Sequence, residues 1–193
     1  AYFTGSATNG DAWRAPGEDT DADLSFERYR DYVATLEKGR FDAIFLYDNV
    51  LPVPDPSRIA RTPALARWDT FTLLAALAVT SSHIGLIGTA STTFNEPYNI
   101  ARRIASLDVL SGGRAGWNVV TATGGGENFN LVSHVDHALR YERAHEFVDV
   151  VKGLWKSTET EAFIRDKHTG VWLDPSRVHP LNHKGRFFQV AGP

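Results

Sequence analysis

The chain has 193 residues, 42% of them hydrophobic, and a formal net charge of −3 at pH 7. This length is enough for one substantial core, and the well-mixed charge lacks the basic patch that nucleic acid or an anionic membrane surface attracts. The chain contains no cysteine, which excludes disulfides, thiolate nucleophiles and cysteine-based metal sites. The longest strongly apolar run, residues 72–79, is too short to span a bilayer, and no basic-then-apolar signal pattern opens the sequence. We therefore expect a cytoplasmic location.

Short apolar runs predict a series of buried β-strands. The clearest three lie at residues 41–48, 83–92 and 114–122. Each is short and rich in β-branched or aromatic residues, which favours a strand over a helix. A first strand is expected within residues 1–8, and a last one within FFQVAG at 187–192.

Helical patterns separate these strands. They cover residues 25–38, 69–80, 96–110 and about 136–155. Asp69 and Asn95 are the expected N-caps of the second and third helices, and glycines follow the first and third. In the last helix, six side chains at spacings of four and three are expected to form the buried face: His137, Tyr141, Ala144, Val148, Val151 and Trp155.

Strands and helices that alternate at short spacing indicate parallel βαβ units, and four or five parallel strands fit two α/β architectures. A doubly wound sheet is one, but the glycine fingerprint G-x-G-x-x-G is missing after the first strand. A (β/α)8 TIM-type barrel needs eight strands and about 250 residues, so this chain would supply roughly the N-terminal half. We expect residues 1–193 to form that part of a single barrel domain, with an insertion at about 156–186. Such a half-barrel is either a piece of a longer protein or pairs with another chain; the absence of methionine favours the former.

Polar side chains lie where the predicted strands end, which is where parallel α/β folds bind ligands. Asp48 ends the first of the three clear strands, and Ser91, Thr92 and Thr93 end the second. Taken alone, these residues are equally well explained as caps or loop anchors. Asn118 lies inside the third strand, where a buried amide needs hydrogen-bond partners that are either other polar side chains or a ligand.

The segment after the third clear strand adds further candidates. That strand ends in Thr121 and Thr123, and three glycines follow at 124–126 without the lysine and hydroxyl of a P-loop, so a flexible loop is expected. His137 and Tyr141 begin the next helix at the same end of the molecule. Alone they could be core residues, but together with the polar strand ends they indicate a site. His134 and Asp136 do not share the helical seam of His137, so no metal site is expected.

Several segments carry a specific family pattern. They include GRFDAIFLYDN at 39–49, GTASTT at 88–93, SGGRAGWNVVT at 111–121 and HALRYERAHEFVDVVKGLW at 137–155. Together these segments resemble the bacterial-luciferase-like flavin monooxygenases, and more narrowly the subgroup of nitrilotriacetate, EDTA and dibenzothiophene-sulfone monooxygenases. The resemblance covers nearly the whole chain in order.

The resemblance implies a TIM-type barrel that binds reduced FMN from a separate, transiently bound flavin reductase. With O2, the enzyme would insert one oxygen atom into a small organic substrate that contains sulfur or nitrogen. The family's FMN contacts match Asp48, Thr92 or Thr93, His137 and Tyr141, and Asn118 would face the same pocket. The resemblance assigns no catalytic acid or base in this chain. A homo-oligomer without nucleic-acid or membrane partners is expected.

Two alternatives stay open. One is a deazaflavin-dependent oxidoreductase of the same superfamily, against which the segment RAGWNVVT argues; the other is a non-catalytic, flavin-binding half-barrel. The chain departs from the family pattern before the helix at 69–80, where Asp69-Thr70 replaces the usual Glu-Pro. Family members also continue past the VAGP segment at 190–193 into four more βα units.

Overall fold

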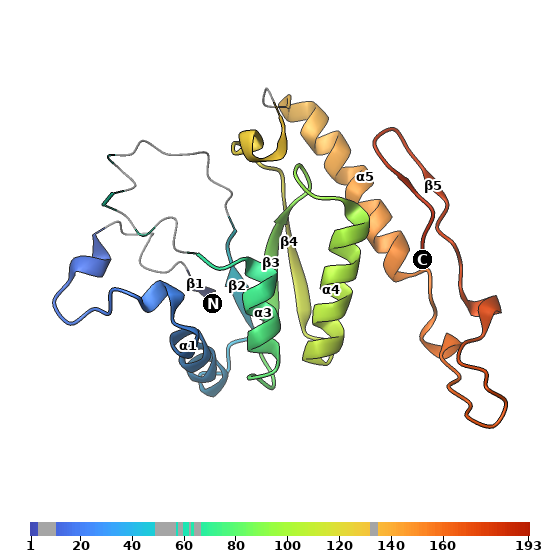
Figure 1. Cartoon of the computed structure of the whole chain (residues 1–193), viewed down its shortest axis with the longest axis horizontal. Helices are drawn as coiled ribbons and strands as arrows, with labels where there is room; N and C mark the ends of the chain where they lie inside the picture. The colour runs from blue at the N-terminus through green and yellow to red at the C-terminus, as the bar shows by residue number, and fades with distance from the viewer. Residues whose placement is uncertain (4–10, 49–56, 58–59, 62, 64–66, 132–134) are drawn as a thin grey trace.

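The computed structural model describes residues 1–3, 11–48, 57, 60–61, 63, 67–131 and 135–193 (Figure 1). In these ranges, four parallel strands form one sheet, and each pairs with the next strand along the chain. The strands are β1 (Tyr2–Phe3), β2 (Ala43–Leu46), β3 (Gly85–Ser91) and β4 (Ala115–Val120). The first strand and the three clear strands of the sequence are thereby confirmed. Residues 4–8 of the first predicted strand lie outside the described residues, and so does His134, which was considered as a metal ligand.

Four long helices accompany the sheet. They are α1 (Phe26–Lys38), α3 (Thr70–Ala78), α4 (Pro97–Ser111) and α5 (His137–Trp155). The side chains of Ser25, Asp69 and Asp136 accept backbone N–H groups at the starts of α1, α3 and α5, which satisfies donors that a helix leaves unpaired. None of the helices in the described ranges is long and apolar enough to cross a membrane.

The ends of α4 differ in part from the prediction. Glu96, rather than Asn95, is the N-cap residue, and its side chain makes no capping hydrogen bond. Asn95 instead donates its Nδ2 hydrogen to the carbonyl of Ser91 at 2.8 Å, so its side chain closes the loop behind it. The predicted end is confirmed, because Gly112 follows α4 with φ 69°, a left-handed conformation that favours glycine.

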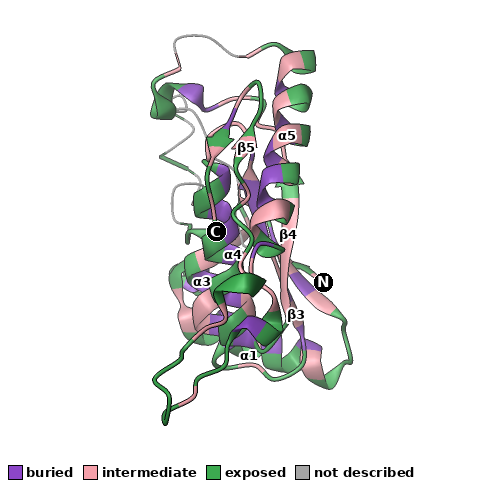
Figure 2. Ribbon diagram, turned by 90° about the vertical axis from the view of Figure 1, so that its right-hand side faces the viewer, coloured by how far each residue is buried: buried purple, intermediate pink, exposed green. Residues whose placement is uncertain are grey.

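All four helices cover the same face of the sheet (Figures 1 and 2). Ile44 and Leu86 of the sheet pack with α1 and α3 in one core, while Ala90 and Trp117 pack with α4 and α5 in a second. Gly88 faces α3 so closely that an added Cβ would lie 2.9 Å from Leu74 Cδ1. A doubly wound sheet carries helices on both faces, so sequential strands with helices on one face indicate the wall of a (β/α)8 barrel.

The buried face of α5 is rotated relative to the prediction. Its buried residues are Arg140, Ala144, Phe147, Val150 and Val151. The prediction was therefore wrong for His137, which is exposed, and for Tyr141 and Trp155, which are 49% and 41% exposed. The physical reason is Phe147, which the predicted seam omitted. Its fully buried ring packs against Trp117 and Phe188 and fixes the rotation of the helix.

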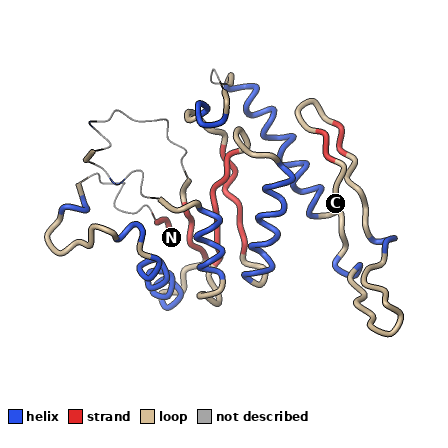
Figure 3. Tube along the Cα trace, viewed as in Figure 1, coloured by secondary structure: helices blue, strands red, loops and turns tan. Residues whose placement is uncertain are grey.

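After α5 the chain leaves the sheet (Figure 3). It forms 3₁₀ turns η6 (Thr160–Ala162) and η7 (Pro175–Arg177) and a hairpin of β5 (His183–Lys184) and β6 (Gln189–Val190). The last predicted strand is thus antiparallel to β5 and not a strand of the main sheet, because Phe188 docks on α5. Three more 3₁₀ turns precede the helices: η2 (Ala12–Arg14), η3 (Ala22–Leu24) and η5 (Gly126–Phe129).

Candidate functional site

A pocket of about 370 Å³ lies at the carboxyl ends of β2, β3 and β4. We call it the carboxyl-end pocket. It is lined by Tyr47, Asp48, Asp69, Phe71, Thr89, Ala90, Ser91, Phe94, Asn95, Arg103, Val120, Thr121, Ala122, Thr123, Gly124 and Phe129. Its volume lies in the range of roughly 300–1,000 Å³ that is common for small-molecule sites. The three polar strand ends predicted from the sequence therefore do meet around one cavity.

The hydroxyl residues at the end of β3 and just after it differ in position: one lines the cavity, and the other two connect neighbouring segments. Ser91 lines the pocket and its Oγ accepts the Thr93 amide at 3.1 Å. Thr92 is 1% exposed, and its hydroxyl donates to the Val120 carbonyl at 3.3 Å. Thr93 Oγ1 accepts the Ala122 amide at 3.2 Å. Thr92 and Thr93 thus join the segments that follow β3 and β4, while Ser91 lies at the cavity itself.

Asn118 has a protein partner. Its Nδ2 donates to Thr89 Oγ1 at 3.1 Å, and the Thr89 hydroxyl donates to the Leu46 carbonyl at 2.9 Å. These bonds cross from β4 through β3 to β2 on the face of the sheet opposite the helices. Since Thr89 lines the pocket, Asn118 lies one hydrogen bond away from it.

His137 and Tyr141 lie one turn apart at the start of α5, with ring centroids 4.7 Å apart. Neither is among the residues that line the carboxyl-end pocket. Tyr141 lines a different groove of about 520 Å³ between β4 and α5, together with Val119, Ala144 and Val148. In the described part of the chain, the predicted site residues therefore form two clusters, one around the pocket and one at the start of α5.

Aromatic side chains that the sequence analysis did not assign form part of the pocket. Phe94 and Phe129 stack with ring centroids 4.4 Å apart and an interplanar angle of 4°. Both line the cavity, and they join the loop after β3 to η5. Phe129 lies in the segment ENFN at 127–130, and nothing in the spacing of this segment indicates a partner 35 positions earlier in the chain.

Arg140 is a second residue that sequence reasoning missed. It is buried on α5 and its Nη1 donates to the Ala122 carbonyl, in the segment after β4 that lines the pocket. Its buried Nε has no hydrogen-bond partner among the described residues. Arg140 thus carries a buried N–H whose desolvation is costly. Its position between His137 and Tyr141 in HALRY was the available signal.

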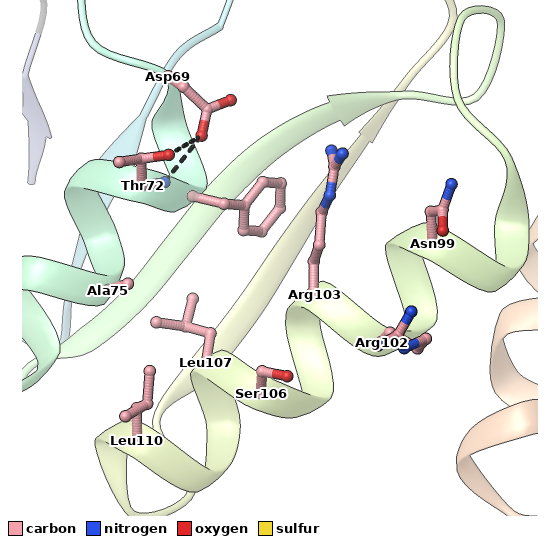
Figure 4. A pocket seen from close by; sticks show the side chains of 10 residues that line it. Asp69, Thr72, Ala75, Asn99, Arg102, Arg103, Ser106, Leu107 and Leu110 are labelled. Carbon is pink, nitrogen blue, oxygen red and sulfur yellow. Dashed lines mark hydrogen bonds between the residues drawn. The ribbon is translucent and has the colours of Figure 1, made fainter.

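A larger and more open groove of about 720 Å³ lies between α3 and α4 (Figure 4). Asp69, Phe71 and Arg103 line both this groove and the carboxyl-end pocket. The Asp69 carboxylate accepts from the Thr72 amide at 2.8 Å and from the Thr72 hydroxyl at 2.6 Å. Arg103 extends from α4 beside this cap, so it places one guanidinium group at the edge of the pocket.

The pocket thus combines aromatic surface, hydroxyl groups, two carboxylates and one guanidinium. Among the described residues, no group of three or more His, Asp or Glu side chains could hold a metal ion. The lining side chains can donate and accept hydrogen bonds and can pack against a planar ring. They are suited to hold and orient a ligand that brings its own reactive chemistry.

Comparison with known proteins agrees with the fold and locates the chain within a family. Residues 7–193 match the family model described as luciferase-like monooxygenase. The N-acetyl-S-(2-succino)cysteine monooxygenase of Bacillus subtilis (strain 168) is 46% identical over 194 residues, which cover 100% of this chain and 43% of that protein. Nitrilotriacetate monooxygenase component A of Aminobacter aminovorans is 43% identical over 191 residues, covering 94% and 42% of the two chains.

A solved structure extends the comparison. The crystal structure of riboflavin lyase with modified FMN and its substrate riboflavin superposes with a TM-score of 0.82 at 34% sequence identity. The match covers 93% of this chain and 42% of that one. The chain therefore spans less than half the length of these relatives. The prediction that it supplies roughly half of a TIM-type barrel is confirmed. With its sequence and fold in agreement, the chain belongs to the luciferase-like monooxygenase family.

Proposed function

We propose that the chain contributes the flavin-binding strands of a two-component monooxygenase. The enzyme would take reduced FMN from a separate flavin reductase and use O2 to oxygenate a small organic substrate. The observation that carries the proposal is the carboxyl-end pocket, which lies where this family of barrels is expected to bind ligands. The name of the relative from Aminobacter aminovorans, component A of a monooxygenase, supports a second, reducing component.

The residues present fit FMN. This ligand has a flat aromatic ring system with polar edges, a chain of hydroxyl groups and a phosphate. Tyr47, Phe94 and Phe129 provide aromatic surface in the pocket, and Ser91 and Thr121 provide hydroxyl groups. The relative solved with modified FMN supports the same kind of ligand here. When bound, reduced FMN supplies the electrons for the reaction with O2.

Each predicted residue has a definable role in this proposal. Asp48 accepts a hydrogen bond from an N–H or O–H group of the ligand, and Asn118 orients the Thr89 hydroxyl at the cavity. Thr92 and Thr93 hold the two loops in register through their backbone partners.

His137 and Tyr141 are proposed to bind the anionic end of the ligand. They lie in the first turns of α5, where the helix dipole favours negative charge, and the Asp136 carboxylate already accepts the amides of Ala138 and Leu139 there. The buried Arg140, three residues after His137, adds a guanidinium on the same helix. The His137 ring N–H and the Tyr141 O–H can both donate to a phosphate, and the two rings lie next to each other in a tilted arrangement.

We further propose that the substrate is a small organic compound that contains sulfur or nitrogen. The names of the relatives support this class, since they include a substituted cysteine, an aminopolycarboxylate and a sulfone. The aromatic pair Phe94–Phe129 provides apolar contact, and Arg103 provides a countercharge for a carboxylate.

The test is oxygenation under multiple turnover. The purified protein is combined with FMN, NADH, a flavin reductase and ¹⁸O2, and organic thioethers and aminopolycarboxylates are offered as substrates. The proposal predicts a product that gains one labelled oxygen atom and depends on FMN, and it predicts little product from Asp48→Asn. FMN binding without oxygenated product would support a non-catalytic binding protein. Hydride transfer to a deazaflavin without O2 uptake would support the other oxidoreductase class.

A further inference from the structure

The guanidinium of Arg143 lies at the junction of three segments. It projects from α5, donates from Nη1 to the Thr92 carbonyl, and donates from Nη2 to the Asn95 carbonyl at 3.5 Å. Its carbon Cζ lies over the Phe188 ring of the hairpin, 4.5 Å from the centroid. One side chain therefore contacts a helix, the loop after β3 and the β5–β6 hairpin.

The surroundings of Arg143 favour a fixed position. Burial lowers the pKa of the guanidinium, while the negative charges of Glu96 and Glu146 act in the opposite direction. The group stays charged, because the pKa of arginine is far above neutral. A planar guanidinium can donate to two carbonyl groups while it stacks on a ring, whereas the point charge of lysine cannot combine these contacts.

The hairpin that supports Arg143 is itself held by α5. Glu146, one turn after Arg143, accepts the backbone amides of Phe187 at 3.1 Å and Phe188 at 2.9 Å. His183 Nε2 lies 3.0 Å from the same carboxylate. These contacts hold the backbone before β6 and the His183 side chain of β5 on α5, and the Phe188 ring lies against Arg143.

The loop that Arg143 contacts is one wall of the carboxyl-end pocket. Ser91, Phe94 and Asn95 line the cavity, and Arg143 binds the backbone carbonyls at positions 92 and 95 of the same loop. Arg143 itself is not among the residues that line the pocket. A substitution of Arg143 would therefore alter the shape of the cavity indirectly, by moving the backbone of this loop.

We propose that Arg143 is a positioning residue of the flavin pocket, which fixes the loop at 92–95 and uses the β5–β6 hairpin as its support. This inference rests on the proposed function, because it assigns the loop a role in holding FMN. According to this inference, residues 183–190, which lie outside the main sheet, help to determine how FMN is positioned in the pocket.

The test compares Arg143→Lys with the matched control Arg186→Lys. Arg186 lies on the same hairpin, pairs with Glu142 at 2.5 Å and stacks over Phe187, but its interactions do not include the loop at 92–95. FMN affinity, the visible circular dichroism of bound FMN at saturation, and the melting temperature are measured for each. We expect Arg143→Lys to weaken FMN binding about tenfold and to change the dichroism, with a nearly unchanged melting temperature. Arg186→Lys is expected to bind FMN within about twofold of the wild type.

A second variant covers the case in which Arg143→Lys does not fold. Phe188→Leu keeps an apolar side chain on α5 but removes the ring beneath the guanidinium, and it should weaken FMN binding about threefold with the same change in dichroism. Wild-type affinity and dichroism in the folded variants would overturn the proposal.

Amide hydrogen exchange separates this proposal from the proposed function. If the wild-type protein does not bind FMN, the proposed function fails, but Arg143→Lys must still speed exchange at residues 92–95 relative to residues 82–84. Unchanged exchange at 92–95 would overturn the positioning role by itself.

Discussion

The two ends of the sheet use polar side chains in opposite ways. At the amino end, charged side chains form hydrogen bonds with backbone groups. The Arg114 guanidinium donates to four carbonyl groups, those of Ala78, Ser81, Ile84 and Ser111. Glu37 accepts the amides of Ser82, His83 and Ile84 at 2.6–3.0 Å. Both side chains close turns at this end of the sheet.

At the carboxyl end, polar side chains surround a cavity. Asp48, Ser91, Thr121 and Thr123 line it together with stacked aromatic rings. The same sheet thus has one end whose polar groups stabilise the backbone and one end whose polar groups are placed for a ligand. In barrels of this type, stability and ligand binding are separated in this manner, so substitutions at the two ends should have different consequences.

The largest expected effect is on stability, at the amino end. Arg114→Ala leaves several half-buried carbonyl groups without their donor, so the free energy of unfolding should fall by about 3 kcal/mol. The FMN affinity of the folded fraction should stay unchanged. Urea denaturation and FMN titration measure the two quantities. A loss of FMN affinity with intact stability would reverse the assignment of the two ends.

Glu37→Gln should have a smaller effect that depends on pH. Burial raises the pKa of Glu37, but the amides of His83, Ile84 and Ser82 outweigh it, and the net pKa lies below the ordinary value. The folded state therefore binds the proton less tightly than the unfolded state. Its contribution to stability is present above the ordinary glutamate pKa of about 4.3 and is lost as the pH falls through the lowered value.

We thus expect wild-type stability to decline below about pH 4.3, and Glu37→Gln to reduce that decline. At neutral pH the variant should lose roughly 1–2 kcal/mol, because a charged acceptor becomes a neutral one. Unfolding free energies measured between pH 3 and pH 7 test both statements. A variant with the same acid dependence as the wild type would show that Glu37 does not contribute to it.

Asp48→Asn tests the carboxyl end. The substitution keeps the size of the side chain but removes its charge, so reduced-FMN affinity should fall about tenfold, or about 1.4 kcal/mol, while the melting temperature stays within about 2 °C. Anaerobic titration and thermal unfolding give the two values. Equal affinity for both proteins would remove Asp48 from the proposed site.

The smallest effects should come from neighbouring hydroxyl groups. Thr92→Val removes a buried hydroxyl that donates to Val120, and should cost about 1 kcal/mol of stability with little change in FMN affinity. Ser91→Ala should do the reverse, because Ser91 lines the pocket. Identical behaviour of the two variants would show that the loop does not divide these roles.

Local signals predicted most of the fold. Asp69 and Gly112 marked helix ends correctly because capping depends on a few adjacent residues. The prediction of the buried face of α5 was wrong because apolar side chains lie on more than one face of this helix. Its rotation is decided by Phe147, whose partners Trp117 and Phe188 are distant in sequence.

The candidate site was predictable only in part, for a similar reason. The carboxyl ends of parallel strands meet by topology, so Asp48 and Ser91 could be placed at one edge from the strand pattern alone. The stacking of Phe94 on Phe129 and the contact of Arg143 with the loop at 92–95 depend on tertiary packing, which spacing does not encode.

Amide hydrogen exchange with and without reduced FMN, under anaerobic conditions, tests most directly whether the carboxyl-end pocket binds flavin. The account predicts slower exchange on FMN addition at residues 91–95 and 121–124, and no change at residues 82–84 beside Glu37. Protection confined to the amino end, or no protection at either loop at saturating FMN, would contradict it.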